Sequence, residues 1–420
     1  MKNTMIRQWS RVRNTYEDYP KPFWTLMGAS FIDSIGASLI FPFLSLYLTS
    51  KFGVGLTEVG ILFGLYSIAT IFGNIIGGAL ADRIGRKGVV IFGLIVSATT
   101  SISLALAPSF DLLYLLVVFV GLFATIGGPA RQAMVADLLP EEKRAEGYGI
   151  HRVVFNLSYV IGPIIGGFLA SRSYLSLFIM DALLSLVVAA IVLFALPETA
   201  PVKTAAEEGE SVTQTFKGYS ELLKDGVFVV FALGFTMLTF VYMQLNSTLP
   251  VFLRDVHSVS TRTYGIMLSV NAAMVVLFQF AITRKTSRYP PMLVMVAGTL
   301  LYALGFGLFG FVSAIAGFFL AVVIVTIGEM LVAPVAQAIV ADLAPEDMRG
   351  RYMAGFNLSH MIAIMSGPLL AGYIIDNLDP RNLWLITGIA GVLAASMFFF
   401  LYRRGRGTVK TVERATQAAD

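Results

Sequence analysis

The sequence predicts an all-α membrane protein whose 12 transmembrane helices form two pseudo-symmetric six-helix bundles. Three observations carry this prediction. Hydrophobic residues make up 56% of the 420-residue chain and charged residues only 13%, about half the charged fraction of a typical soluble domain. Apolar runs of about 18 residues or more, long enough to cross a bilayer, recur along the whole chain. A long segment of the first half also reappears in the second half.

The duplication is clearest in one decapeptide. Residues 132–141 read QAMVADLLPE, and residues 337–346 read QAIVADLAPE, 205 residues further on. The same offset separates Gly162-Pro163 from Gly367-Pro368. A single offset held over about forty residues indicates two duplicated half-proteins rather than a short-repeat solenoid.

Twelve apolar segments are each long enough to span about 30 Å at roughly 1.5 Å per residue. A polar connection, 197–225, separates six from six, and its end, 216–223, could form a surface amphipathic helix. We therefore expect a tail 1–21, a bundle 22–196, a linker 197–225, a bundle 226–402 and a tail 403–420. The expected helices are 22–49, 57–81, 87–107, 111–138, 145–170, 173–196, 226–253, 261–284, 290–311, 314–342, 349–376 and 380–402.

The positions of Lys and Arg predict the orientation, because basic residues concentrate in cytoplasmic loops. With the N-terminus inside, only five of the 30 Lys and Arg residues fall in outer loops. Both termini and the linker are therefore expected in the cytoplasm, and the chain in the cytoplasmic (plasma) membrane. The first 21 residues do not have the apolar core of a cleaved signal peptide. The chain has no cysteine, which excludes disulfide bonds and thiolate metal sites.

The loop between the second and third predicted helices, residues 78–87, reads GALADRIGRK. A glycine permits the tight turn, and the crowded charges suit a cytoplasmic loop. The order of residues resembles the G-x-L-A-D-R-x-G-R-K signature of the major facilitator superfamily at nearly every position. In that family such a loop joins a carboxylate on helix 4 and the N-terminus of helix 11. The resemblance therefore implies a conformational switch made of Asp82, Arg83, Gly85, Arg86 and Asp137.

A second motif lies in the fifth predicted helix, where Gly162, Pro163, Gly166 and Gly167 follow one another closely. Proline removes a backbone hydrogen bond and kinks a helix, and glycines let a neighbouring helix approach. The pattern is similar to the antiporter motif of the drug:proton antiporter branch. A packing kink without a transport role is the alternative. The resemblance implies a bacterial multidrug exporter, functional as a monomer, whose two bundles rock about a central cavity.

Ionisable groups at membrane depth are costly and are functional candidates. Asp33 lies about 16 Å into the first helix at 1.5 Å per residue, and Glu329 is near the midplane of the tenth. The charged form of a carboxyl group is disfavoured there, so both could bind and release protons. Glu329 is the main candidate for proton coupling, and His360 could relay protons to it. The alternatives are hydrogen-bonded structural roles for Glu329 and His360 and an ion pair for Asp33.

Two arginines, Arg131 and Arg152, are candidate charge partners in the first half, and Arg152 could pair with Asp33. Snorkelling to the cytoplasmic headgroups is the alternative for both. Aromatic, Met and amide side chains are candidates for the substrate surface, because Met and aromatic groups adapt to several ligands. They could equally face lipid or pack between helices. These residues are Phe41, Phe43, Tyr47, Tyr66, Phe155, Tyr159, Tyr242, Met243, Gln244, Asn246, Met330 and Met361.

We therefore expect a proton-coupled exporter of small amphipathic or cationic compounds, not an enzyme. Its expected partners are the small-molecule substrate, protons and the lipid bilayer, with no cofactor and no nucleic acid. The sequence has neither a Walker A motif nor the metal-ligand pattern of a membrane protease. Three alternatives remain: a metabolite or nutrient symporter or uniporter, a lipid translocator of the same fold, and a receptor that transports nothing.

Overall fold

The structure is a computed structural model that describes residues 18–200, 222, 224–345 and 348–404. These residues form 12 helical segments long and apolar enough to cross a membrane, and they contain no β-strand. The predicted all-α membrane fold is confirmed. Both predicted tails, apart from residues next to the first and last helices, lie outside the described residues. So do most of the linker and nearly all of its predicted amphipathic helix at 216–223.

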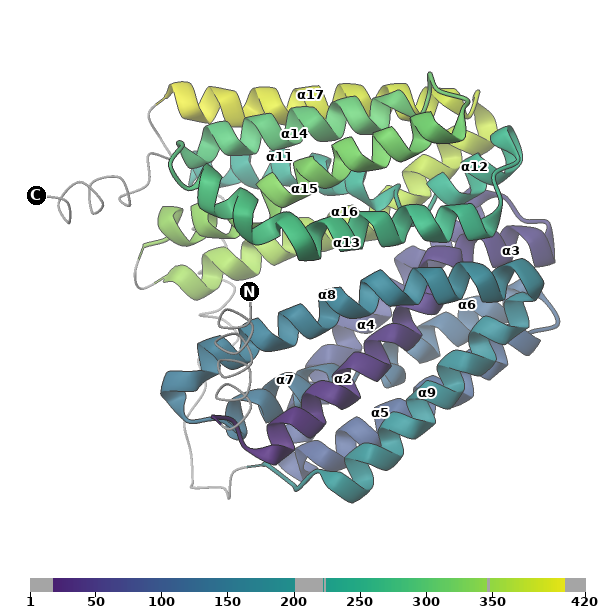
Figure 1. Cartoon of the computed structure of the whole chain (residues 1–420), viewed down its shortest axis with the longest axis vertical. Helices are drawn as coiled ribbons and strands as arrows, with labels where there is room; N and C mark the ends of the chain where they lie inside the picture. The colour runs from purple at the N-terminus through teal and green to yellow at the C-terminus, as the bar shows by residue number, and fades with distance from the viewer. Residues whose placement is uncertain (1–17, 201–221, 223, 346–347, 405–420) are drawn as a thin grey trace, which may run out of the picture. The chain divides into compact units, whose positions relative to one another are not determined.

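Within each half of the chain, the helices follow one another with short connections (Figure 1). Their bounds are α2 Lys21–Ile40, η1 Phe41–Phe43, α3 Leu44–Phe52, α4 Leu56–Ile84, α5 Arg86–Leu106, α6 Phe110–Phe119, η2 Val120–Ala124, α7 Gly127–Asp137, α8 Glu141–Arg172, α9 Tyr174–Ala195, α11 Gly226–Met243, α12 Leu249–His257, α13 Thr261–Thr286, α14 Pro291–Leu308, α15 Ile315–Leu343, α16 Arg349–Asn377 and α17 Arg381–Arg403.

The segment expected as one helix over 226–253 is two helices, α11 and α12, so that expectation was wrong. Gln244 explains the break. Its side-chain oxygen accepts hydrogen bonds from the hydroxyls of Ser247 (3.2 Å) and Thr248 (2.9 Å), while its amide donates to the Phe240 carbonyl at 2.7 Å. Pro250 then stands in the first turn of α12, where its missing N–H costs nothing. The Gln244 side-chain amide thus bonds the Phe240 carbonyl, while the backbone N–H of Gln244 turns to the Val241 carbonyl at 3.3 Å.

Residue contacts group the chain into two compact units. The first comprises residues 1–40 and 68–204, and the second comprises residues 41–67 and 205–420. These units match the two halves predicted from the duplication, except that residues 41–67 group with the second half and the boundary falls inside the predicted linker. Those residues include the end of the first membrane-spanning segment and the beginning of α4, and they pack with helices of the second half.

Two kinds of packing hold the first unit together. Buried side chains from α2, α5, α7 and α9 form a hydrophobic core. The backbone of α4 also lies directly against η2 and the residue before α7. A Cβ atom added to Gly77 would lie 2.6 Å from the Cα of Ile126, and one added to Gly73 would lie 2.8 Å from the Leu122 carbonyl oxygen. Small residues allow this approach where lipid supplies no hydrophobic driving force between helices. The core includes Phe23, Leu26, Val90, Leu94, Met134, Val188 and Val192.

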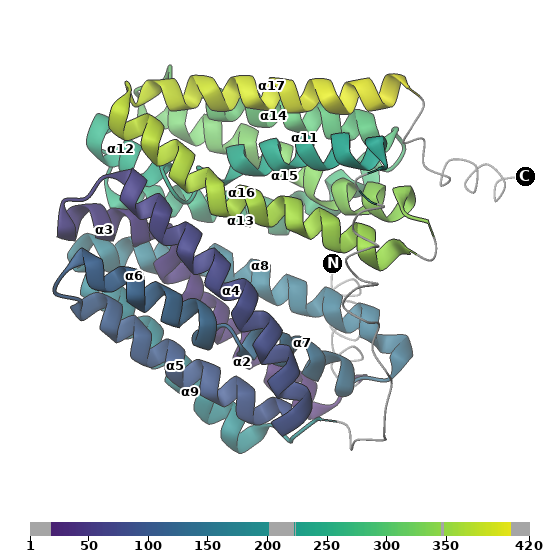
Figure 2. The same cartoon turned by 180° about the vertical axis from the view of Figure 1, so that it is seen from behind.

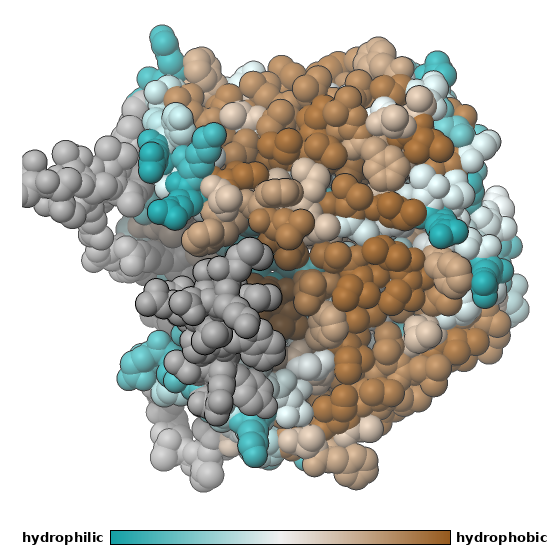
Figure 3. Space-filling view, viewed as in Figure 1, coloured by the Kyte–Doolittle hydropathy of each residue, from teal (hydrophilic) through white to brown (hydrophobic). Residues whose placement is uncertain are grey.

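In the second unit α14 lies between α15 and α17 (Figures 1 and 2). Gly298 and Gly328 face each other across the crossing of α14 and α15, since a Cβ on either would come within 3.0 Å of the other's carbonyl oxygen. Aromatic side chains pack together at the start of α17. Trp384 lies there against Phe252 of α12 and against Phe309, just after α14, with ring-centroid distances of 5.0 and 5.3 Å. On the visible surface, apolar residues cover the middle of the helices and hydrophilic ones gather near their ends (Figure 3), as a bilayer requires.

We expect Gly77→Ala to destabilise the protein, because the new methyl group meets backbone atoms that cannot move aside. Overpacking of this kind costs about 1–3 kcal/mol. The matched control is Gly28→Ala in α2, where an added Cβ meets nothing within 4 Å. Thermal unfolding in detergent should show a lower midpoint for Gly77→Ala only, and equal midpoints for the two variants would contradict the close approach at Ile126.

Candidate functional site

The turn between α4 and α5 is built on Gly85. Its φ of 104° lies in the region open mainly to glycine. A Cβ at this position would also lie 2.5 Å from the Oε2 atom of Glu198. Backbone conformation and space therefore both require a glycine here, and any side chain would displace the acid that caps α5.

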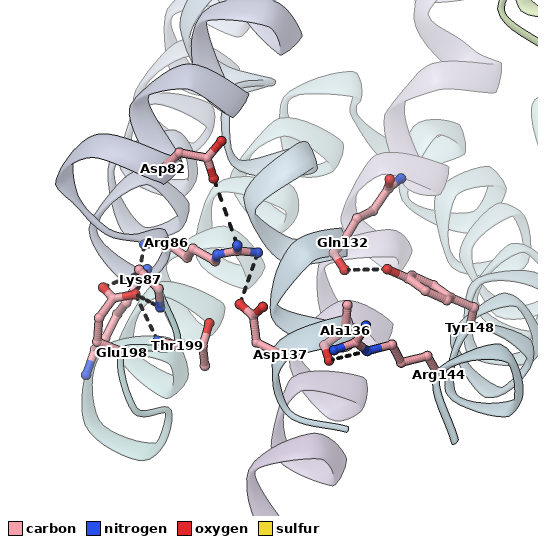
Figure 4. Close-up of polar contacts among 11 residues, drawn as sticks. Asp82, Arg86, Lys87, Gln132, Ala136, Asp137, Arg144, Tyr148, Glu198 and Thr199 are labelled. Atoms are coloured by element: carbon pink, nitrogen blue, oxygen red, sulfur yellow. Dashed lines mark hydrogen bonds and ion pairs between the residues drawn. The ribbon is translucent and has the colours of Figure 1, made fainter. Parts of the chain in front are cut away.

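Arg86 is the centre of the predicted switch (Figure 4). Its guanidinium lies 3.0 Å from the carboxylate of Asp137 at the end of α7, and 3.9 Å from that of Asp82 on α4. The Asp82 side chain is 73% exposed, so its pair with Arg86 contributes little by itself. The structure thus places the predicted Asp82, Arg86 and Asp137 together, while Arg83 is exposed in the last turn of α4. The switching role remains a prediction.

Glu198, just beyond the end of α9, is a residue of this site that the sequence analysis missed. Its carboxylate accepts hydrogen bonds from the backbone N–H groups of Arg86 (2.8 Å) and Lys87 (3.2 Å), the first free donors of α5 (Figure 4). The ammonium group of Lys87 in turn donates to the Leu196 carbonyl at 2.8 Å. An acid directly after an apolar span is the only signal in the sequence, because its partners lie more than 100 positions away.

The pKa of Glu198 reflects two opposing effects. Burial raises the pKa, but hydrogen bonds from the backbone N–H groups of Ala200, Arg86, Thr199 and Lys87 outweigh burial and leave the pKa below its ordinary value. Donors that point at a carboxylate stabilise its charged form, and the positive end of the α5 dipole acts in the same direction.

The Gly-Pro motif lies inside α8, which stays one continuous helix across Pro163. Gly162 faces α2, because a Cβ placed there would lie 2.8 Å from the Cβ of Ser38 and closer still to its hydroxyl oxygen. Gly166 and Gly167 are buried. The predicted close approach of a neighbouring helix is thus present at Gly162, and the neighbour is α2.

Asp33 on α2 forms an ion pair with Arg131 on α7, and both side chains are about a quarter exposed or less. Arg152 is exposed on α8 and makes no ion pair within the described parts of the chain. The partner suggested for Asp33 was Arg152, and the structure gives it Arg131 instead. A third acid, Asp181 of α9, is buried and accepts a hydrogen bond from the Ser101 hydroxyl at 2.5 Å.

Glu329 on α15 has a different environment. Its Oε1 accepts a hydrogen bond from the Tyr242 hydroxyl of α11 at 3.1 Å, and its Oε2 accepts one from the Asn271 amide of α13 at 2.9 Å. Asn271 also donates to the Thr326 hydroxyl at 2.9 Å. Among the described residues no Lys, Arg or His forms an ion pair with Glu329. This partly exposed carboxyl group is therefore held by neutral donors from two other helices.

Asn271 was also missed, and its signal was an amide in the apolar run of the eighth span. The predicted partner His360 lies elsewhere on the same unit. Its Nδ1 is 3.4 Å from the Thr239 hydroxyl, and its ring is 6.1 Å from that of Phe235. No hydrogen bond joins His360 to Glu329 among the residues that the structure describes, and the proton relay remains a prediction.

An apolar recess opens in the second unit. Phe41, Phe63 and Tyr66 line one side, and Met243, next to Tyr242 in the chain, lines another. Three of these four residues, all except Phe63, were among the predicted substrate liners. The other lining residues are Ser67, Ser247, Ile364 and Pro368.

Other residues predicted to line the substrate surface differ in how far their side chains are exposed. Phe155 and Tyr159 on α8 pair with each other at 4.8 Å between ring centroids, and Phe155 is 44% exposed. Asn246 is partly exposed in the turn before α12. Gln244 and Met330 are 0% and 1% exposed, so they serve the helix break and the packing of α15 and are left out of the proposed substrate surface.

Comparison with known proteins agrees with this architecture. The family model described as Major Facilitator Superfamily matches residues 26–331 and 246–419. The chain belongs to the major facilitator superfamily. It is therefore a membrane transporter of the kind that carries small molecules or ions, not an enzyme.

Among curated relatives, a Na(+), Li(+), K(+)/H(+) antiporter of Planococcus maritimus is 30% identical over 87% of this chain and 92% of its own. The multidrug resistance protein MdtH of Shigella flexneri is 24% identical over 90% of this chain and 94% of its own. A solved structure of the nucleoside transporter NupG has a TM-score of 0.78 at 16% identity, and it covers 91% of this chain and 100% of that one. At such identity the last match shows the fold alone.

We expect Glu198→Ala to lower thermal stability at neutral pH by about 0.5–2 kcal/mol, the usual cost of removing a helix cap. Because the folded-state pKa of Glu198 is lowered, this contribution is present above its ordinary pKa of 4.5 and is lost as the pH falls through the folded value. Melting curves at pH 7 and near pH 4 check this. Glu142→Ala in the first turn of α8 is the control, and a difference between Glu198→Ala and wild type that did not change with pH would refute the assignment.

Proposed function

We propose that the chain is a proton-coupled secondary exporter of small amphipathic or cationic compounds. It works by alternating access in the cytoplasmic membrane of a bacterium, as a monomer with both termini inside. The observation that carries this proposal is the environment of Glu329, a carboxyl group within a membrane span whose described partners are all neutral.

Charge explains why Glu329 is the better proton carrier. Ionised Asp33 is paired with Arg131, so protonation of Asp33 would leave the Arg131 cation unpaired in the membrane. Glu329 has no such partner among the described residues, and it becomes neutral only by binding a proton. A neutral carboxyl group removes most of the cost of a charge at that depth. Proton binding can therefore change the energy of one conformation relative to another, which coupling requires.

The recess supports the substrate class. Its lining is almost entirely apolar and includes three aromatic side chains and one methionine, groups that suit varied apolar ligands. Tyr242, whose hydroxyl donates to Glu329, is the chain neighbour of Met243, which lines the recess. A cationic amphipathic compound would place its apolar part in the recess and its charge toward ionised Glu329. A proton and a cation would then compete for one carboxylate, which produces antiport.

The comparisons lend support at low identity. The curated relatives include a protein named for multidrug resistance and one named for cation/H(+) antiport. The Asp82–Arg86–Asp137 cluster and the α8 glycines would then act in the conformational cycle, not in substrate binding. His360 is retained as a secondary candidate in proton transfer through Thr239.

The test is Glu329→Gln in proteoliposomes. The amide keeps the size of the side chain and cannot ionise, so transport of a lipophilic cation driven by a pH gradient should fall at least about tenfold. Exchange of labelled for unlabelled substrate without a gradient should persist, since it needs no net proton transfer. Glu142→Gln is the control with a surface carboxylate. Full gradient-driven transport by Glu329→Gln would exclude Glu329 as the coupling residue.

A second candidate is exchange of an alkali cation for protons. It is favoured by two hydroxyl oxygens in this network, that of Tyr242, which binds Glu329, and that of Thr326, which the Asn271 amide bridges to Glu329, and by the cation antiporter among the relatives. Hard cations prefer oxygen ligands.

We expect an assay in everted vesicles that hold a pH gradient to distinguish the two proposed functions. Added lipophilic cations should collapse the gradient if the first proposal holds, and added Na⁺, Li⁺ or K⁺ should do so if the second holds. Thr326→Val removes one oxygen ligand and should weaken only an alkali-cation response, several-fold in apparent affinity. An unchanged alkali-cation response in Thr326→Val would exclude that hydroxyl as a ligand.

A further inference from the structure

Pro334 stands inside α15, which stays helical on both sides of it. A proline has no N–H to donate, so it leaves the carbonyl four residues before it without its helical hydrogen bond. That carbonyl belongs to Met330, a residue with only 1% of its surface exposed. A buried carbonyl within a membrane span needs another donor, because lipid supplies none.

Gln279 of α13 supplies that donor. Its side-chain amide donates to the Met330 carbonyl at 3.0 Å, and to the hydroxyl of Thr283, one turn further along α13, at 2.9 Å. These two bonds use both protons of the amide group. Since α13 and α15 pack against each other (Figure 1), the bond to Met330 ties two neighbouring helices together at the proline.

The first half of the chain accommodates the corresponding proline in another way. Pro129 stands 205 positions before Pro334, but there the helix is interrupted by η2 and resumes only with α7. Pro129 thus lies in the first turn of α7, where the N–H groups have no helical partner in any case. Thr125, which corresponds to Met330, has a carbonyl that accepts a backbone N–H three residues on at 3.0 Å. In the second half α15 is continuous, and an amide from another helix takes the place of the missing N–H.

The bond bears on Glu329 because Met330 is the next residue in the chain. On the other side of Glu329, Gly328 lies in direct backbone contact with α14. The backbone is therefore held on both sides of the residue that carries the carboxyl group, by α14 before it and by α13 after it. Asn271, about 12 Å from Gln279 along α13, donates to the carboxylate itself.

We propose that Gln279 is a positioning residue for proton coupling: by bonding the carbonyl that Pro334 leaves free, it holds the turn of α15 that carries Glu329. That turn presents the carboxylate to its two neutral donors, Asn271 and Tyr242. The inference rests on the role of Glu329 in the proposed function, and Gln279 itself takes no proton. Without the bond the turn can move away from α13, so proton binding and the conformational change become less tightly linked.

The test is a double-mutant cycle with Pro334→Ala, because alanine restores the N–H that the Met330 carbonyl lacks. Gln279→Met keeps the length of the side chain and removes both amide donors. With Pro334 present, this change should lower the midpoint of thermal unfolding in detergent by about 2–4 °C. In the Pro334→Ala background it should shift the midpoint by less than about 1 °C.

Equal shifts in the two backgrounds would show that Gln279 does not act through the Met330 carbonyl, and would overturn the proposal. If Gln279→Met folds only together with Pro334→Ala, that rescue supports the proposal. If it folds in neither background, the proposal fails.

The functional readout is a ratio measured in proteoliposomes with tetraphenylphosphonium as the lipophilic cation. It compares transport driven by a pH gradient with exchange in the absence of a gradient. Gln279→Met should lower this ratio about fivefold, because only the first process needs net proton transfer at Glu329. With Pro334→Ala also present, the ratio should lie within about twofold of that of Pro334→Ala alone. A merely structural defect would lower both processes equally, and that result would exclude a positioning role.

The matched control is Asn377→Met. The Asn377 amide also donates to a backbone carbonyl, that of Tyr373 at 2.9 Å, but it is exposed and the bond lies within the last turns of α16. The ratio should stay within about 1.5-fold of the parent in this variant. Lost coupling in Glu329→Gln with an unchanged ratio in Gln279→Met would overturn this inference alone, whereas coupling retained in Glu329→Gln would overturn the proposed function.

Discussion

Direct contact between helix backbones is the constraint on which the rest of this structure depends. Helices in a bilayer gain little from burying apolar side chains against one another, because lipid is equally apolar. Close packing must come from small residues, and Gly77, Gly298, Gly328 and Gly60 each stand where another backbone would meet a Cβ atom. These contacts position α4, α14, α15 and α16, and through them the polar side chains that the helices carry.

The polar groups then divide into two kinds. The charges of some groups are balanced by an opposite charge in the same unit, as in the Asp33–Arg131 pair and the Arg86–Asp137 pair. Glu329 is compensated only by neutral donors among the described residues. A proton that binds a compensated pair leaves the cation of that pair without its partner, whereas a proton that binds a lone carboxylate removes the charge from the site. This difference, and not depth in the membrane, distinguishes the proposed coupling residue from the other acids of the chain.

The site could be predicted from the sequence where a motif is local and could not where partners are distant. Asp82 and Arg86 are neighbours on one loop, and Glu329 stands out as an acid in an apolar run. Glu198 and Asn271 carry no such signal, because each acts on residues that only folding brings near. The same holds for the break after Met243, where the buried Gln244 side chain bonds the Phe240 carbonyl and the hydroxyls of Ser247 and Thr248.

The sequence by itself determined the class of fold, the number of membrane spans and the duplication, because bilayer thickness and the absence of water require long apolar helices whatever their neighbours are. Only the tertiary structure decided which acid has a cation beside it, which glycines meet a backbone, and that the Asp376 carboxylate accepts the first backbone N–H groups of α4. The reason is physical: span length is a property of one helix, whereas charge compensation and close approach are properties of pairs of helices. Those pairs lie up to 320 positions apart in the chain.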